Sequence, residues 1–216
     1  MPYDLCIFDL DGTLTDPKLG ITRSYQYALA GFGIHEALED LERFIGPPLR
    51  DNFRDNYGFS DSETEKAVAL FREFFAETGL FENYVYPDIC VTLQKLKNAG
   101  KTLAVATNKY EYFAEKVLCH FDLDKYFAYI SGDAKDGSLT INGKLDIIRI
   151  VLEKLDPKRR MSAVMIGDRK HDIIGARENG IESIGVTWGY GSGTELEEAG
   201  ATMIAGSVEE LYRMLI

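Results

Sequence analysis

The sequence has few of the residues that would mark a secreted, membrane-spanning or zinc-dependent protein. Its three cysteines are widely spaced, none forms a C-x-x-C pair, and its three histidines are scattered. These features argue against a zinc site and predict reduced, mostly buried thiols in a cytoplasmic protein. No apolar run approaches the roughly 18–20 residues that span a membrane. The residues before the first apolar run lack the basic region of a signal peptide.

Positive charge is also scarce. The chain has 24 lysines and arginines against 35 aspartates and glutamates, a formal net charge of -11. This balance disfavours a nucleic-acid polymer or a membrane surface as a partner. An anionic substrate would therefore need cations and backbone N–H groups placed locally in its site. The 216 residues, 45% of them hydrophobic, suffice for one full core and a small second domain.

One stretch of the chain shows only helical spacing of its apolar residues. Between residues 21 and 78, apolar side chains recur every three to four positions, and no strand pattern interrupts them. Ser60 and Glu63 have the spacing of a capping box, which predicts the start of a helix. The stretch therefore predicts a module of four helices.

Beyond residue 87 the pattern changes to helices that alternate with short apolar strands. This alternation predicts an α/β fold with a Rossmann-like parallel sheet covered on both faces. We therefore expect a core of residues 1–16 and 86–216, into which a helical domain of residues 17–85 is inserted. The predicted strands cover residues 5–8, 102–106, 127–131, 162–166, 182–186 and 202–204.

Two carboxylates follow the first predicted strand directly. Asp9 and Asp11 stand in the sequence D-L-D-G-T, at the end of the apolar run 5–8. Ligands of open α/β sheets bind outside the carboxyl ends of the strands. There, one acid could attack as a nucleophile while the other moves protons. The same residues also fit a simple Asx turn that closes the strand. A catalytic interpretation of the motif therefore requires matching residues at other strand ends.

Two further strand ends supply such parts. Thr107 and Asn108 follow the strand at 102–106 and are predicted just before a helix N-terminus, where their donors favour a phosphate. Thr107 alone also fits a routine N-cap. Asp168 follows the strand at 162–166 and is expected to bind a divalent cation. Asp172, one helical turn later, fits either a metal ligand or a supporting role.

Two cations are candidates for contact with an anion. Lys144 falls at the predicted start of a helix, where a cation is unfavourable for the helix dipole. This placement indicates that Lys144 faces an anion. Arg50 follows Pro47-Pro48 in the helical domain and is our preferred candidate for reading a second group of the substrate. For either residue alone, a solvated surface position is the ordinary alternative.

Together these residues resemble the four motifs of the haloacid dehalogenase (HAD) superfamily, and the resemblance covers essentially the whole chain. The helical insert is similar to the C1 cap of that family. The resemblance implies the family's α/β fold and its phosphoryl-transfer chemistry. In the family's order, the four motif elements are the segment Asp9–Thr13, Thr107, Lys144, and Asp168 with Asp172.

The resemblance also implies a role for each motif residue. Asp9 would be the nucleophile that forms an aspartyl-phosphate, and Asp11 the general acid and base. Thr107 and Lys144 would hold the phosphoryl oxygens. Mg²⁺ would be bound by residues of the first and last motifs, namely Asp9, the backbone carbonyl of Asp11, Asp168 and, in support, Asp172.

Within the superfamily, the second acid at position 11 argues against a dehalogenase, which has no alkoxide leaving group to protonate. The chain is most similar to phosphoglycolate phosphatase-like and 5′-nucleotidase-like enzymes. Its segment Gly167-Asp168-Arg169 departs from the Gly-Asp-Ser common in phosphoglycolate phosphatases and favours the nucleotidase-like group. The segments that carry this resemblance are Phe8–Pro17, Phe44–Leu49, Gly167–Asp172 and Gly185–Gly193.

The function predicted from the sequence is therefore a Mg²⁺-dependent phosphatase. Its expected substrate is a small phosphorylated metabolite, either a 5′-nucleotide or a compound like phosphoglycolate. One alternative is a phosphosugar mutase of the same superfamily, which would return the phosphoryl group to its substrate. Another is a binding or regulatory module without turnover, which the presence of both acids of the first motif disfavours.

Overall fold

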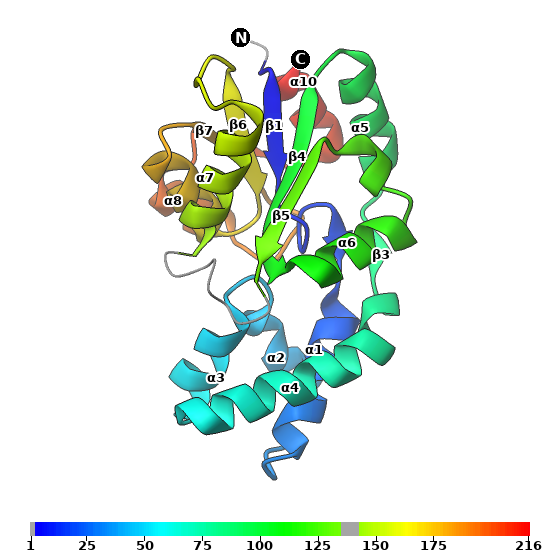
Figure 1. The fold of residues 1–216 in the computed structure, drawn as a ribbon, viewed down its shortest axis with the longest axis vertical. Coiled ribbons are helices and arrows are strands. Elements are labelled where there is room, and N and C mark those ends of the chain that lie inside the picture. The colour runs from blue at the N-terminus through cyan, green and yellow to red at the C-terminus, as the bar shows by residue number, and fades with distance from the viewer. Residues whose placement is uncertain (1–2, 135–142) are drawn as a thin grey trace. The chain divides into compact units, whose positions relative to one another are not determined.

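A computed structural model describes residues 3–134 and 143–216 (Figure 1). The chain divides into two compact units, Met1–Asp16 with Val85–Ile216 and Pro17–Tyr84. The first unit holds a six-stranded sheet of order β5-β4-β1-β6-β7-β8, and all of its strand pairs are parallel. This arrangement confirms the predicted α/β fold. The strands are β1 (Leu5–Phe8), β4 (Thr102–Tyr110), β5 (Tyr129–Asp133), β6 (Ala163–Gly167), β7 (Glu182–Val186) and β8 (Met203–Ala205).

The central strand β1 is buried along its whole length, as its apolar sequence predicts. It lies between β4 and β6, with Phe8 in register with Val105 on one side and Ile166 on the other. The chain first extends the sheet from β1 to β4 and β5, and then returns to the other side of β1 with β6. The strand order therefore reverses at β1, and such switch points are where ligands bind in open α/β sheets.

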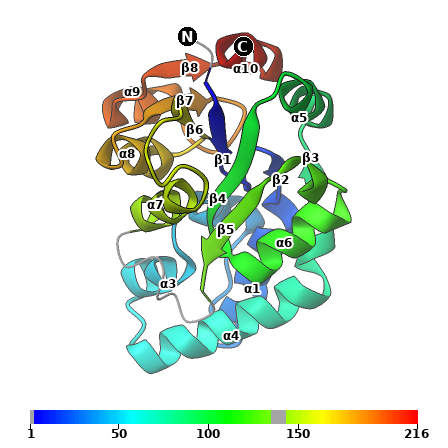
Figure 2. The ribbon, with the colours of Figure 1, turned by 45° about the horizontal axis from the view of Figure 1, so that its top comes forward.

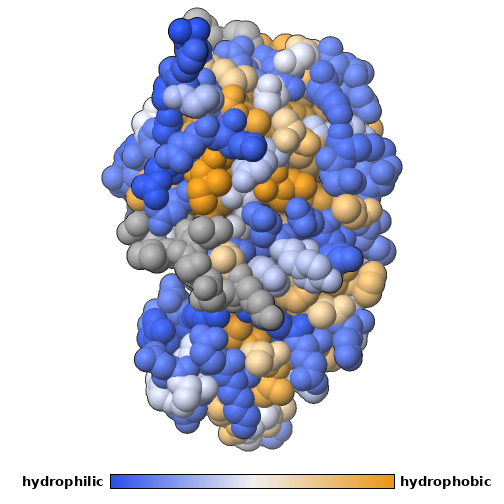
Figure 3. All heavy atoms as spheres, viewed as in Figure 1, coloured by the Kyte–Doolittle hydropathy of each residue, from blue (hydrophilic) through white to orange (hydrophobic). Residues whose placement is uncertain are grey.

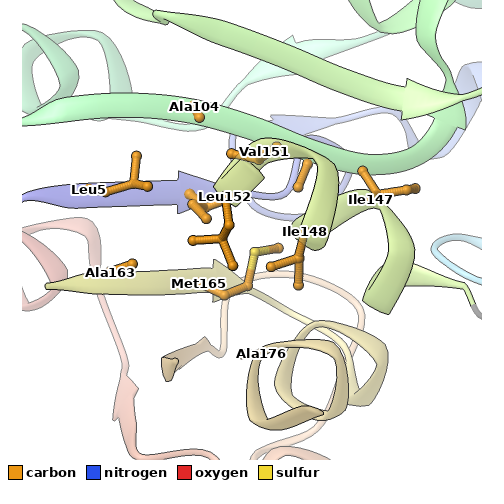
Figure 4. Close-up of a cluster of buried hydrophobic side chains, with 11 residues drawn as sticks. Leu5, Ala104, Ile147, Ile148, Val151, Leu152, Ala163, Met165 and Ala176 are labelled. Carbon is orange, nitrogen blue, oxygen red and sulfur yellow. The ribbon is translucent and has the colours of Figure 1, made fainter. Parts of the chain in front are cut away.

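Helices cover both faces of the sheet, α7 and α8 on one and α5 and α6 on the other (Figure 2). In Figure 4, Ile147, Ile148 and Val151 of α7 pack against side chains of β1, β4 and β6. This packing fixes the start of α7 over the sheet. The α-helices among the described residues of the unit are α5 (Ile89–Asn98), α6 (Glu111–His120), α7 (Lys144–Leu155), α8 (Lys170–Glu178), α9 (Gly193–Ala199) and α10 (Val208–Leu215).

Two elements of this unit differ most from the sequence prediction. Strand β4 continues to Tyr110, four residues beyond its predicted end, because Tyr110 pairs with Asp133 after a register shift. Helix α9 was not predicted, although it has local signals. The Ser192 side chain caps it by accepting from the Glu195 backbone N–H, and Gly200 ends it in the left-handed conformation.

The prediction of mostly buried thiols is wrong for two of the three cysteines. Cys6 is buried in β1, whereas Cys90 and Cys119 are exposed. Both exposed residues lie on amphipathic helices whose buried positions fall on another face. The buried positions are Ile89, Thr92, Leu93 and Leu96 in α5, and Phe113, Ala114, Val117 and Leu118 in α6.

The second unit is helical. Tyr25 stands at its centre, with its ring against those of Phe44, Phe53 and Phe71. The predicted capping box is present, with Ser60 and Glu63 each bonding the backbone N–H of the other. The α-helices of this unit are α1 (Lys18–Ala30), α2 (Leu38–Leu41), α3 (Leu49–Tyr57) and α4 (Asp61–Glu77). Two short strands, β2 (Thr15–Asp16) and β3 (Tyr84–Val85), pair with each other where the chain passes from one unit to the other.

Within the described residues, no helix is both long and apolar enough to cross a membrane. Figure 3 shows hydrophilic side chains over most of the viewed face, with apolar side chains in separate patches.

Candidate active site

The carboxyl end of β1 and its neighbouring strands carry a cluster of buried charged side chains. Asp9 follows β1, and its backbone N–H donates to the carbonyl of Ile166 in β6 at 2.8 Å. Asp168 follows β6, and Asp172 lies in the first turn of α8. All three aspartates are at most 5% exposed. The sheet thus brings together acids that are up to 163 residues apart in the sequence.

Lys144 joins two of these acids. Its Nζ lies 2.8 Å from Asp9 Oδ1 and 2.9 Å from Asp172 Oδ1, and it donates to the carbonyl of Ala106 at 3.0 Å. Burial by itself would lower the pKa of Lys144, but Asp172 and Asp9 outweigh it and hold this pKa above its ordinary value. At its unfavourable position at the start of a helix, Lys144 therefore faces two carboxylates, and its phosphate-binding role stays a prediction.

The carboxylate of Asp9 is held in one orientation. Its Oδ1 accepts from the backbone N–H of Leu10 at 2.7 Å and also pairs with Lys144. A carboxylate fixed by a backbone donor and a buried cation is preorganised, and it loses little conformational freedom when it reacts.

Asp168 is held by the glycine-rich loop that follows β7. Its Oδ2 accepts from the backbone N–H of Tyr190 at 2.8 Å. A Cβ at Gly189 would lie 2.4 Å from this oxygen, and one at Gly191 would lie 1.9 Å from the carbonyl oxygen of Asp168. The loop can approach the carboxylate so closely only because these two positions carry no side chain.

Gly12 completes this close packing from the first motif. Its φ is +85°, and a Cβ there would lie 2.2 Å from Asp168 Oδ2. The Thr13 hydroxyl lies beside it and donates to Asp168 Oδ1 at 3.4 Å. The first motif therefore shapes the surroundings of Asp168 as well as supplying its own two acids.

Asp11 pairs with a lysine that the sequence analysis did not select. Lys109 Nζ lies 2.6 Å from Asp11 Oδ2, and both side chains are nearly buried. Burial raises the pKa of Asp11, and the charge of Lys109 opposes that shift. Sequence spacing could not reveal this pair, because it joins residues 98 positions apart through the unpredicted end of β4.

Thr107 and Asn108 lie inside β4, and not just before a helix as predicted, because α6 begins only at Glu111. Thr107 is 2% exposed, and its hydroxyl accepts from the backbone N–H of Lys109 at 3.3 Å. Its phosphate-binding role stays a prediction, and so does that of Asn108.

Arg50 belongs to the helical unit and stands in the first turn of α3. Its guanidinium bonds both carboxylate oxygens of Glu65, at 2.6 and 3.1 Å. This bidentate contact fixes the plane of the guanidinium. That Arg50 binds a second group of the substrate stays a prediction.

The donor set fits a hard divalent cation. Single oxygens of Asp9, Asp168 and Asp172 lie within 4.8 Å of one another. Burial raises the pKa of Asp168 to about 8, and the carboxylates of Asp172 and Asp9 add to this effect. Such mutual repulsion between buried acids is relieved by a bound cation, and carboxylate oxygens are the ligands that Mg²⁺ prefers.

The ion pairs of the site leave its charge unbalanced. Within the part of the chain that is described, the cations paired with its carboxylates are Lys109 and Lys144. Two positive charges thus face four carboxylates when all are ionised. One divalent cation would neutralise the remainder. The carboxylates are those of Asp9, Asp11, Asp168 and Asp172.

Comparisons with known proteins identify the family of this chain. The family model of haloacid dehalogenase-like hydrolases matches residues 6–186. A Pseudomonas aeruginosa protein named 5′-nucleotidase is 44% identical over 99% of this chain and 96% of its own. A Mycobacterium tuberculosis protein named tyrosine-protein kinase PtkA is 36% identical over 98% of this chain and 72% of its own. Proteins named phosphoglycolate phosphatase match at 28–31% identity.

A solved structure shows the same fold. A predicted phosphatase from Clostridium acetobutylicum superposes with a TM-score of 0.94 at 43% identity, and the match covers 100% of this chain and 99% of the other. The chain belongs to the haloacid dehalogenase-like hydrolase family. The predicted family and enzyme class are therefore confirmed.

Proposed function

We propose that this protein is a Mg²⁺-dependent phosphomonoesterase that works through an aspartyl-phosphate on Asp9. The observation that carries the proposal is the Asp9 carboxylate, which Leu10 N–H and Lys144 hold at the switch point of the sheet. Asp11 stands two residues away, close enough in sequence to serve the same reacting group. The names of several relatives support phosphatase chemistry.

Hydrolysis takes two steps, and each step combines one phosphoryl transfer with one proton transfer. An Asp9 oxygen attacks phosphorus, the bond from phosphorus to the ester oxygen breaks, and Asp11 gives that oxygen its proton. Asp11 then takes a proton from water, which attacks the phosphorus of the aspartyl-phosphate and releases inorganic phosphate and free Asp9. General acid–base catalysis of this kind contributes typically ~10²–10⁴-fold.

The remaining residues supply charge. Lys144 neutralises phosphoryl oxygens beside Asp9, and Thr107 donates to them from β4, with Asn108 beside it. Asp9, Asp168, Asp172 and the backbone carbonyl of Asp11 would hold Mg²⁺. When bound, the ion supplies positive charge that offsets the charge of the phosphate and of the attacking carboxylate.

The proposed substrate is a small metabolite, with a 5′-nucleotide ahead of phosphoglycolate. The 44% identity to a protein named 5′-nucleotidase supports this order, and so does the Gly167-Asp168-Arg169 segment. In this proposal the helical unit selects the substrate, and Arg50 binds a second group of the substrate, apart from the phosphate.

A panel of phosphomonoesters assayed with Mg²⁺ tests the proposal. Inorganic phosphate should be released from at least one 5′-nucleotide or small organic phosphate. EDTA should abolish release, and added Mg²⁺ should restore it. Full activity in excess EDTA would contradict the metal assignment. Appearance of the phosphoryl group on another substrate position, or on an added acceptor in place of water, would make the enzyme a mutase or a phosphotransferase.

A further inference from the structure

Lys109 and Asp11 form an ion pair separate from the Lys144 network. The Lys109 Nζ lies 2.6 Å from Asp11 Oδ2, with the two side chains 8% and 11% exposed. Lys144 already serves Asp9 and Asp172. Each acid of the first motif therefore has its own lysine, and the lysine of Asp11 comes from the end of β4.

The backbone around Lys109 is fixed by its neighbours. The register of β4 against β5 shifts between Ala106 and Tyr110, which carries Lys109 past the regular part of the ladder. A Cβ at Gly132 in β5 would lie 2.6 Å from the carbonyl oxygen of Lys109. The backbone N–H of Gly132 in turn donates to Glu111 at 3.1 Å. None of these contacts to the backbone around Lys109 involves the Asp11 side chain.

The two oxygens of Asp11 have different surroundings. Oδ2 pairs with Lys109, whereas Oδ1 is buried and accepts no hydrogen bond from any described residue. A buried carboxylate oxygen without a donor is costly for a resting protein. We take this cost to indicate that Oδ1 has a hydrogen-bond partner when substrate is bound.

We propose that Lys109 is a positioning residue, which holds Asp11 through Oδ2 so that Oδ1 is presented for proton transfer. This inference rests on the proposed function, in which Asp11 gives a proton to the leaving oxygen and takes one from water. Lys109 acts through Asp11 and forms no bond to the substrate. Without it, Asp11 would sample other rotamers, and the step that needs its proton would slow.

The test compares esters that differ in their need for a proton. An alkoxide leaving group needs the proton of Asp11, whereas p-nitrophenolate leaves without one. Cleavage rates in a single turnover are measured for p-nitrophenyl phosphate and for the alkyl phosphate that the wild type hydrolyses fastest. Lys109→Met should slow alkyl ester cleavage by about 10²-fold, the lower range of general-acid effects. Aryl ester cleavage should fall less than about five-fold, and KM should change less than about two-fold.

Further variants separate positioning from a merely structural role. Lys109→Arg keeps a cation and should restore most of the alkyl rate. In an Asp11→Asn background, Lys109→Met should change the rate by less than about two-fold, because its effect passes through Asp11. Lys101→Met is the matched control. Lys101 lies just before the start of β4, and its side chain donates to the backbone carbonyl of Tyr3, away from Asp11. It should leave the ratio of alkyl to aryl rates unchanged.

Several results would overturn the inference. Equal losses on both esters would assign Lys109 to folding, and a raised KM with unchanged cleavage rates would make it a substrate ligand. An additive loss in the Asp11→Asn background would show that Lys109 does not act through Asp11. A wild type inactive on every ester would instead overturn the proposed function, and this inference with it.

Discussion

Replacing Asp168 with asparagine should stabilise the metal-free protein and remove its response to Mg²⁺. Above about pH 8, where Asp168 ionises in the metal-free protein, the substitution deletes one charge from a buried cluster of acids. The asparagine Oδ1 can still accept from the Tyr190 N–H, and the hydroxyl of Thr13 can rotate to accept from the new amide. The change is therefore mainly electrostatic.

The structure sets the size of this effect. Oxygens of Asp9, Asp168 and Asp172 lie no more than 4.8 Å apart. At this distance two unit charges repel by roughly 3.5 kcal/mol at an effective dielectric constant of about 20. Lys144, which is bonded to Asp9 and Asp172, offsets part of this repulsion. We expect a net stabilisation on the order of 2 kcal/mol, which would raise Tm by about 4–8 °C in EDTA.

Thermal unfolding in EDTA and in Mg²⁺ provides the assay. Mg²⁺ at about 100 times its Kd should stabilise the wild type by about 2.7 kcal/mol, which corresponds to roughly 5–11 °C. Asp168→Asn should show little or no such shift. Asp156→Asn is the control, because Asp156 is a buried acid that accepts from the backbone N–H groups of Arg160 and Met161. It should keep the full Mg²⁺ response.

Two outcomes would refute the reasoning. A Tm for Asp168→Asn below that of the wild type in EDTA would mean that the acid cluster carries no net repulsion. An undiminished Mg²⁺ shift in this variant would place the metal elsewhere.

Two further predictions concern the loop after β7 and the helical unit. In a denaturant titration, Gly191→Ala should lower the free energy of unfolding by about 1–3 kcal/mol, because its Cβ would meet the Asp168 carbonyl oxygen at 1.9 Å. Gly193→Ala is the control, because nothing lies within 4 Å of its Cβ. It should change the free energy of unfolding by less than about 0.5 kcal/mol. Arg50→Ala should reduce kcat/KM for the best natural substrate by roughly ten-fold and spare a small aryl phosphate, whereas exposed Arg54→Ala should alter neither. Equal losses on both substrates would show that Arg50 supports folding of the unit instead of substrate selection.

Local patterns predicted most of the elements. The bounds of β1 follow from an apolar run that ends at Asp9, and the start of α4 follows from the Ser60 capping box. Such features depend on neighbours within a few positions. The meeting of Asp9, Lys144 and Asp168 followed only after the parallel sheet was assumed, since parallel strands place their carboxyl ends at one edge.

What the sequence missed depends on distant contacts. The final residues of β4 are held by pairing with Asp133, so periodicity within 102–110 could not reveal them. The pairing of Lys109 with Asp11 depends on that extension. The close approach of Gly189 to Asp168 likewise joins residues of different loops. In contrast, α9 was predictable, because Ser192 and Glu195 have the spacing of an N-cap.

The most direct test of the account is to locate the phosphoryl group on the enzyme. Asp11→Asn should accumulate a phosphoenzyme from p-nitrophenyl phosphate, because formation needs no proton for the leaving group while hydrolysis lacks its base. Acid quenching, proteolysis and tandem mass spectrometry of the peptide that contains β1 should place the group on Asp9, and the Asp9→Asn variant should carry none. A phosphoryl group on any other residue, or phosphate release with no phosphoenzyme at any time, would contradict the account.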